Sequence, residues 1–189
     1  MRRILSCAAL LVASSCTCLA QSPAIPPLDK STMDMSYYPV NHPILKLQGK
    51  ATEPLMARVI YSRPMRSGRK IIGNLMEYGK VWRMGANEST EIEFFRDGRI
   101  GEKTVKKGRY TLYAIPDSDN WTIAVNRETD TWGAFQYDPS KDVLRYQVKP
   151  GKSKEPIEAF TICFDGSGRL ANLNILWDDF HLVIPIRFL

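Results

Sequence analysis

Short runs in which apolar and polar residues alternate recur along most of the chain from Ile44 onward. Alternation with a period of two is typical of a β-strand that buries one face. Turn residues separate the runs at intervals of about 10 to 15 residues. The predicted strands are ILKLQG (44–49), MARVIYS (56–62), TEIEFF (90–95), RYTLYAI (109–115), WTIAVN (121–126), VLRYQVK (143–149), EAFTICF (158–164), ANLNILW (171–177) and HLVIPIRF (181–188).

This spacing of strands and turns predicts an all-β fold. We expect a single antiparallel β-sandwich, jelly-roll-like, or a partly open barrel. One short helical turn near residues 69–76 is the exception, because Ile71, Ile72 and Leu75 have the i, i+3, i+4 spacing of a helix face. We expect the apolar residues of this turn to plug one end of the sandwich.

The N-terminal residues 1–20 are typical of a secretion signal, with an arginine pair, a short apolar run and a small-residue cleavage site that ends at Ala20. The apolar run is too short to span a bilayer, so we expect an exported protein, periplasmic or extracellular, without a transmembrane segment. The alternative is a lipoprotein signal, in which Cys16 carries an outer-membrane lipid anchor. The remaining chain divides into a Pro-rich leader at 21–43 and a single β domain at 44–189.

The overall charge is modest, with 26 lysines and arginines against 20 acidic residues and a formal net charge of +6. No recognition motif or long basic run accompanies it, so nucleic acid is not an expected partner. Three of the four cysteines lie in the predicted signal. The fourth, Cys163, lies in an alternating run, where we expect a small core side chain and no intramolecular disulfide.

Positive charge is concentrated in the segment Tyr61–Ser89, between two predicted strands. It contains four arginines, two lysines and four glycines but only two glutamates. Loops that carry charge and need glycine flexibility are frequent binding surfaces. Within this segment, the run WRMGANE at 82–88 is the strongest candidate for a binding site. The residues that we single out for a binding site are Arg63, Trp82, Arg83, Asn87, Glu88 and, from a later loop, Trp132.

These residue types are suited to glycan binding. Aromatic rings such as Trp82 and Trp132 stack on sugar faces, while guanidinium, amide and carboxylate groups bind hydroxyls. A structural interpretation stays open for the same residues. In it Asn87 takes a left-handed turn conformation, and Glu88 pairs with Arg83 or Arg63.

Groups for catalysis or metal binding are sparse. The two histidines, His42 and His181, have no second ligand at metal-binding spacing, and no cofactor motif is present, so we expect neither metal nor cofactor. We interpret Glu91 and Glu93 as outward positions of one strand, and Asp178-Asp179 as a solvated strand end. No catalytic residue is assigned.

Several longer motifs resemble a known family. YSRP, GRKIIG, YGKVWRMGANEST, KKGRYTLYAIP, NWTIAVN, DTWGAF and NILWDD are similar to those of the bacterial secreted family catalogued as domain of unknown function 2911. The resemblance covers the chain from about Met33 to Phe188. It implies a secreted, mostly β domain. It implies no activity, so it assigns no catalytic residue.

Three hypotheses about function follow. The preferred one is a non-catalytic domain that binds a ligand or partner through residues 61–89: a glycan, an anionic small molecule or an envelope protein. The alternative is a hydrolase or glycan-modifying enzyme, with Glu88 and Asp130 as acid/base residues and Arg83 holding an anionic substrate group. The third is a structural accessory of the cell envelope whose basic loop contacts other proteins.

Overall fold

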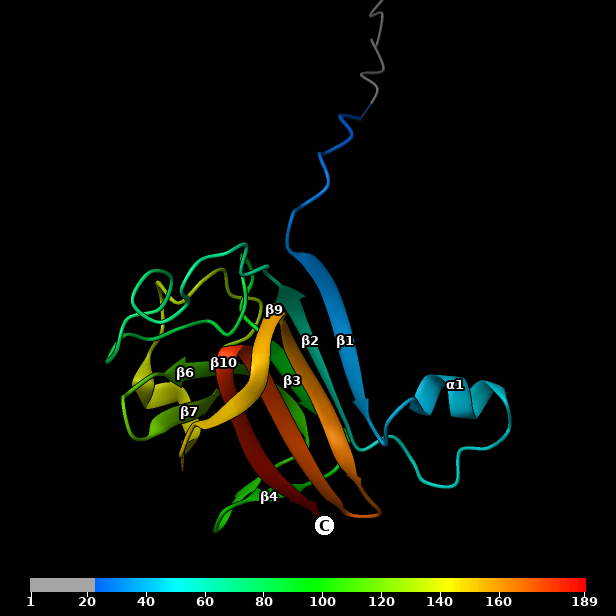
Figure 1. Cartoon of the computed structure of the whole chain (residues 1–189). Helices are drawn as coiled ribbons and strands as arrows, with labels where there is room; N and C mark the ends of the chain where they lie inside the picture. The colour runs from blue at the N-terminus through cyan, green and yellow to red at the C-terminus, as the bar shows by residue number, and fades with distance from the viewer. Residues whose placement is uncertain (1–22) are drawn as a thin grey trace, which may run out of the picture.

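Two antiparallel β-sheets pack face to face (Figure 1). The computed structural model describes residues 23–189, so the predicted signal and Cys16 lie outside the described residues. One sheet has six strands in the order β1-β2-β3-β6-β7-β8, and the other has four in the order β5-β4-β10-β9. The elements are β1 (Thr32–Tyr38), α1 (His42–Leu47), β2 (Ala57–Arg63), β3 (Glu91–Phe94), β4 (Gly98–Ile100), β5 (Lys103–Val105), β6 (Gly108–Ile115), β7 (Trp121–Asn126), η1 (Pro139–Lys141), β8 (Asp142–Val148), β9 (Gly151–Ser167) and β10 (Leu170–Phe188).

The predicted all-β sandwich is confirmed, and neither sheet closes into a barrel. The alternating apolar residues of both sheets meet in one core. Large aromatic side chains fill its centre: Trp121 and Trp177 are 1% and 2% exposed. Trp177 stacks on Trp82, with ring centroids 6.0 Å apart and planes 16° from parallel. These rings form the floor beneath one end of the sandwich.

Part of the predicted leader belongs to the larger sheet. Residues 32–38 form β1, which pairs with β2 along its whole length. Tyr38, at the end of this strand, is 1% exposed, and its hydroxyl donates to the carbonyl of Leu170 at 2.7 Å. The leader therefore supplies both a strand and a core side chain.

The strand predicted at 44–49 is wrong, because residues 42–47 form helix α1. Pro43 lies in the first helical turn, where its fixed φ suits a helix and its missing N–H costs nothing. The alternating apolar residues do not mark a buried face: Ile44 and Leu47 are 55% and 87% exposed, and α1 projects from the sheets (Figure 1). Within residues 23–189, α1 and the other helical segments lack the length and apolar content needed to cross a membrane.

The helical turn expected near residues 69–76 does not form: the segment is a hydrogen-bonded turn closed by a bridge between Ile72 and Met76, and the 3-10 helix of the described residues is η1. The N–H groups of Leu75 and Met76 both donate to the carbonyl of Ile71 at 3.0 Å. Ile71 and Met76 are buried in the core cluster, whereas Leu75 is 44% exposed. The buried residues therefore anchor this segment at the end of the sandwich.

The last two predicted strands form one strand, β10, with register irregularities on both sides of Asp178. The expectation of a solvated strand end is wrong for Asp178, which is 9% exposed. Its carboxylate accepts from the N–H of Ile71 at 3.2 Å and pairs with Arg66 Nε at 3.0 Å. This contact ties the segment after β2 to the smaller sheet.

Candidate ligand-binding site

Trp82 anchors the segment between β2 and β3 to the core. Its N–H donates to the carbonyl of Ala114 at 2.7 Å and its carbonyl accepts from Ala114 N–H at 2.9 Å. Its ring lies edge-on to Phe160, with centroids 5.0 Å apart, and the residue is 7% exposed. Trp82 is thus a core residue whose remaining exposed surface faces a cavity.

A cavity of about 230 Å³ lies beside Trp82. We call it the Arg83 cavity, and its walls include Pro64, Arg69, Leu75, Trp82, Arg83 and Trp177. The other lining residues are Ser31, Gly85 and Ala86, so no carboxylate lines it. Apolar and aromatic walls with few polar groups are typical of small-molecule sites.

The two guanidinium groups of the cavity have no carboxylate partner within the described residues. Arg83 Nε is buried and bonds to nothing in residues 23–189. Burial lowers the pKa of Arg83, because withdrawal from water disfavours the charged form. Arg69 donates to the carbonyls of Met65 and Arg66 at 2.6 and 2.9 Å. The cavity therefore carries positive charge that the described chain leaves uncompensated.

The backbone next to Arg83 is held by side chains from the sheet. Met84 has φ 57°, and its carbonyl accepts from Thr90 Oγ1 at 2.5 Å. Ser62 Oγ accepts from Ala86 N–H at 2.7 Å and donates to Ala86 O at 2.5 Å. A Cβ on Gly85 would lie 2.9 Å from Ser62 Oγ, so only glycine fits this close approach. The cavity wall is consequently preorganised.

Arg63, also predicted to bind a ligand, lies in a different environment. Its Nη1 pairs with Asp34 at 3.0 Å, its Nε donates to Phe160 O at 3.1 Å and its Nη2 donates to Thr161 Oγ1 at 2.9 Å. These partners belong to β1 and β9, so Arg63 joins both sheets at the edge of the sandwich. It does not line the Arg83 cavity.

Asn87, Glu88 and Trp132 come together in a third place. Glu88 and Trp132 form an isolated backbone bridge, and Gly133 N–H donates to Asn87 O at 2.9 Å. Asn87 has φ 59°, which confirms the left-handed turn of the structural interpretation. Its amide donates to Asp29 at 2.8 Å. Trp132 is 61% exposed on this rim, apart from the Arg83 cavity.

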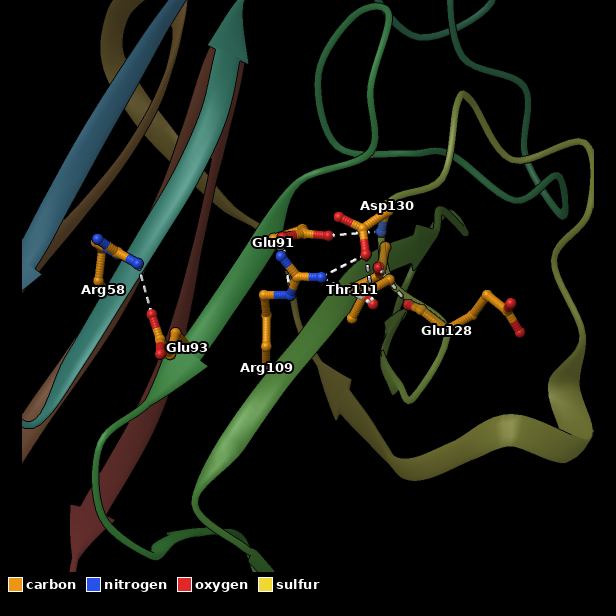
Figure 2. Close-up of polar contacts among 8 residues, drawn as sticks. Arg58, Glu91, Glu93, Arg109, Thr111, Glu128 and Asp130 are labelled. Carbon is orange, nitrogen blue, oxygen red and sulfur yellow. Dashed lines mark hydrogen bonds and ion pairs between the residues drawn. The ribbon is translucent and has the colours of Figure 1, made fainter.

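Charged residues on the outer face of the six-stranded sheet neutralise one another (Figure 2). Glu93 pairs with Arg58 at 2.6 Å, and Arg109 pairs with both Glu91 and Asp130. The N–H of Asp130 donates to Glu91 at 2.7 Å. This network brings together the two strand carboxylates that the sequence predicts on one face, and it holds the loop after β7 against the sheet.

The geometry does not assemble the acid/base pair of the hydrolase hypothesis in a cavity. Asp130 is engaged by Arg109, Glu88 is exposed, and neither lines the Arg83 cavity. Among residues 23–189, no group of three or more His, Cys, Asp or Glu side chains is placed to hold a metal ion. Cys163 is half-buried, and burial raises the pKa of its thiol, which disfavours a thiolate.

Fold and cavity together define an all-β, sandwich-like domain with a cation-lined cavity at one end. The family model described as "Protein of unknown function (DUF2911)" matches residues 46–186, and the chain belongs to this family. The family resemblance read from the motifs is thereby confirmed. Comparisons with curated proteins and with solved structures gave no match for this chain.

The sequence did not indicate that Arg69 lines the same cavity as Arg83. The arginine content of residues 61–89 was the available signal, and it singled out the right segment. It could not separate Arg63, which is paired, from Arg69 and Arg83, which are not, because the acidic partner of Arg63 comes from β1. That pairing depends on strand register, and no local spacing encodes it.

Proposed function

We propose that this domain is non-catalytic and binds the anionic group of a small ligand in the Arg83 cavity. The observation that carries the proposal is the Arg83 guanidinium, whose Nε is buried without a partner among the described residues. A buried charge without a partner costs stability, and an incoming anion offsets that cost. Arg69 adds a second cation to the same cavity.

The size and walls of the cavity narrow the class of ligand. A guanidinium group binds a carboxylate through two parallel hydrogen bonds, which favours a carboxylate over a diffuse anion. A volume of about 230 Å³ admits one ring rather than a chain. Trp82 and Trp177 line the cavity, and Trp82, the more exposed of the two at 7%, supplies a small aromatic surface against which the edge of a ring can pack. A uronic acid, a sugar ring that carries a carboxylate, meets all three conditions.

Titration with glucuronate, and with glucose as the matched neutral ring, tests the proposal. Calorimetry is expected to detect glucuronate binding and no glucose binding at the Arg83 cavity. Arg83→Ala should weaken glucuronate binding at least about tenfold, because a charge-assisted pair contributes that much or more. Arg127→Ala, which removes an exposed arginine outside the cavity, should not change it. Equal affinity of wild type and Arg83→Ala would refute the proposal.

We further infer that the domain acts after export. The arginine pair, apolar run and small-residue cleavage site of residues 1–20 support this inference. Mass spectrometry of protein recovered from periplasm and medium tests it. A mature N-terminus at Gln21 is the expected result, whereas an acylated Cys16 would favour the lipoprotein alternative. Recovery of the intact chain from the cytoplasm alone would contradict export.

A further inference from the structure

A larger cleft is lined by other residues of the segment between β2 and β3. Its volume is about 840 Å³, and its lining includes Arg66, Lys70, Tyr78, Lys152, Asp178 and Asp179. We call it the Tyr78 cleft. A hollow of about 190 Å³ shares Tyr78, Lys152 and Asp179 with it and extends it toward Trp121. The volume of the cleft alone is within the range of sites that bind small molecules.

An irregularity in β10 shapes this cleft. Register shifts lie on both sides of Asp178, which has φ 50°, a conformation that only a few residue types besides glycine adopt readily. Asp178 is turned inward to Arg66, while the next residue, Asp179, is exposed and lines the cleft. Bulges often redirect side chains at binding sites, so this irregularity is grounds for a functional hypothesis.

The charges of the Tyr78 cleft balance, unlike those of the Arg83 cavity. Arg66, Lys70 and Lys152 face the carboxylates of Asp178, Asp179 and Glu77 in one lining. A balanced set offers hydrogen-bond donors and acceptors without a net charge. Such a lining suits a neutral ligand with many hydroxyl groups, since each hydroxyl both donates and accepts.

Tyr78 adds an aromatic surface to these polar groups. The residue is 54% exposed although it is aromatic. Its neighbour Gly79 donates its N–H to Pro116 O at 2.8 Å, which fixes the chain beside the ring. An exposed aromatic ring on a fixed backbone provides a stacking surface for a sugar at little entropic cost.

We propose that the Tyr78 cleft binds a neutral oligosaccharide of about two or three rings, given the volume of the cleft and its hollow. Tyr78 stacks on one sugar face, and Asp179 and Lys152 bind hydroxyls. Arg66 and Asp178 neutralise each other and fix the wall. This site goes beyond the proposed function, because its lining shares no residue with the Arg83 cavity.

NMR titration of the ¹⁵N-labelled protein with maltotriose, cellotriose and laminaritriose tests the proposal. At least one is expected to bind with a Kd below about 5 mM and to shift the amide signals of residues 70–79, 152 and 178–180. Tyr78→Ala and Asp179→Asn, both at exposed positions, should each weaken binding at least about tenfold without changing the fold. Phe135→Ala removes an aromatic residue that is 87% exposed and lies outside the cleft, so it should leave binding unchanged.

Several results would overturn the proposal. One is that no trisaccharide binds, and another is that binding survives Tyr78→Ala. If trigalacturonate shifts the same amide signals and binds more tightly than every neutral trisaccharide, the ligand of the cleft is anionic and the proposal is wrong. Arg83→Ala separates the two sites, because it should weaken glucuronate binding at least about tenfold and leave trisaccharide binding unchanged. Loss of both ligands in Arg83→Ala would contradict a second site.

Discussion

Arg63 and Arg83 are close in sequence, but their guanidinium groups have opposite surroundings. Every nitrogen of Arg63 has a partner, on Asp34, Phe160 or Thr161. Arg83 Nε is buried without one among the described residues, and no carboxylate lines its cavity. The first arginine joins strands, whereas the second faces an open volume.

This difference distinguishes two uses of the same side chain. Buried polar groups in folded proteins are nearly always hydrogen-bonded, so a fully bonded arginine needs no explanation beyond the fold. An arginine without a partner lowers the stability of the free protein, and a ligand that supplies the missing anion recovers it. The contrast predicts substitutions with opposite signs at the two positions.

Arg63→Ala should have the largest effect on stability. Removal of the ion pair and two further hydrogen bonds should lower the free energy of unfolding by about 2 kcal/mol, discounted for the partial exposure of the pair. Urea unfolding followed by tryptophan fluorescence measures it. Arg127→Ala is the control, because Arg127 is exposed and forms no ion pair within residues 23–189. If both variants unfold alike, Arg63 does not join the sheets as described.

Arg83→Met should instead raise the free energy of unfolding by about 1 kcal/mol, because an apolar side chain replaces a half-buried guanidinium whose buried Nε has no partner among the described residues. The same substitution should abolish glucuronate binding. A gain in stability together with a loss of binding is the result expected when a side chain serves a ligand site at the expense of the stability of the free protein. A loss of stability as large as that of Arg63→Ala would show that Arg83 is structural and would remove the contrast.

Local pattern was sufficient where burial alternates along a paired strand. In β3, Ile92 and Phe94 are buried and the two glutamates that alternate with them face outward, so a period of two predicts the strand. The run at 44–49 has a similar alternation but forms α1, which has no buried residues. Alternation predicts a strand only when a neighbouring strand is available, and the sequence pattern does not contain that information.

The candidate site was harder to predict, because contacts between residues distant in sequence decide which of its arginines form ion pairs. Arg63 and Arg66 have carboxylate partners because β1 and β10 bring them, whereas Arg69 and Arg83 have none among the described residues. The irregularity that turns Asp178 inward lies in the middle of a strand and has no glycine or proline as a signal. The sequence therefore predicted the segment, but it did not predict which of its arginines have carboxylate partners.

Arg109→Ala tests an ion-paired arginine on the outer face of the six-stranded sheet. It should lower the free energy of unfolding less than Arg63→Ala does. Arg109 is 47% exposed, so its pairs with Glu91 and Asp130 should contribute about 0.5 to 1 kcal/mol. The loop that Arg109 holds should open locally, which would speed hydrogen exchange at the amides of Asp130 and Thr131. Unchanged exchange there would mean that backbone contacts alone fix the loop.

Tyr137 tests the hydrogen bond of another paired arginine, Arg145. Its substitution should have the smallest effect on stability, and that effect should depend on pH. Its hydroxyl donates to Asp142 at 2.6 Å and accepts from Arg145 at 2.9 Å. Burial, followed by the hydrogen bond to Asp142, raises the pKa of Tyr137 from 10.0 to about 12. Below pH 10 the phenol is neutral in both states, so its contribution to stability is fully present. Between pH 10 and about 12 the unfolded chain ionises first, and the contribution is lost.

The stability difference between wild type and Tyr137→Phe should therefore shrink as the pH rises from about 9 to about 12. Urea unfolding at several pH values measures it, and the other tyrosines with raised pKa, Tyr38, Tyr61 and Tyr110, affect both proteins equally. Parallel stability curves would show that the phenol is not held neutral by its partners. Arg145 would then be held by its ion pair with Asp142 at 2.7 Å alone, because its hydrogen bond to Tyr137 would contribute nothing to the folded state.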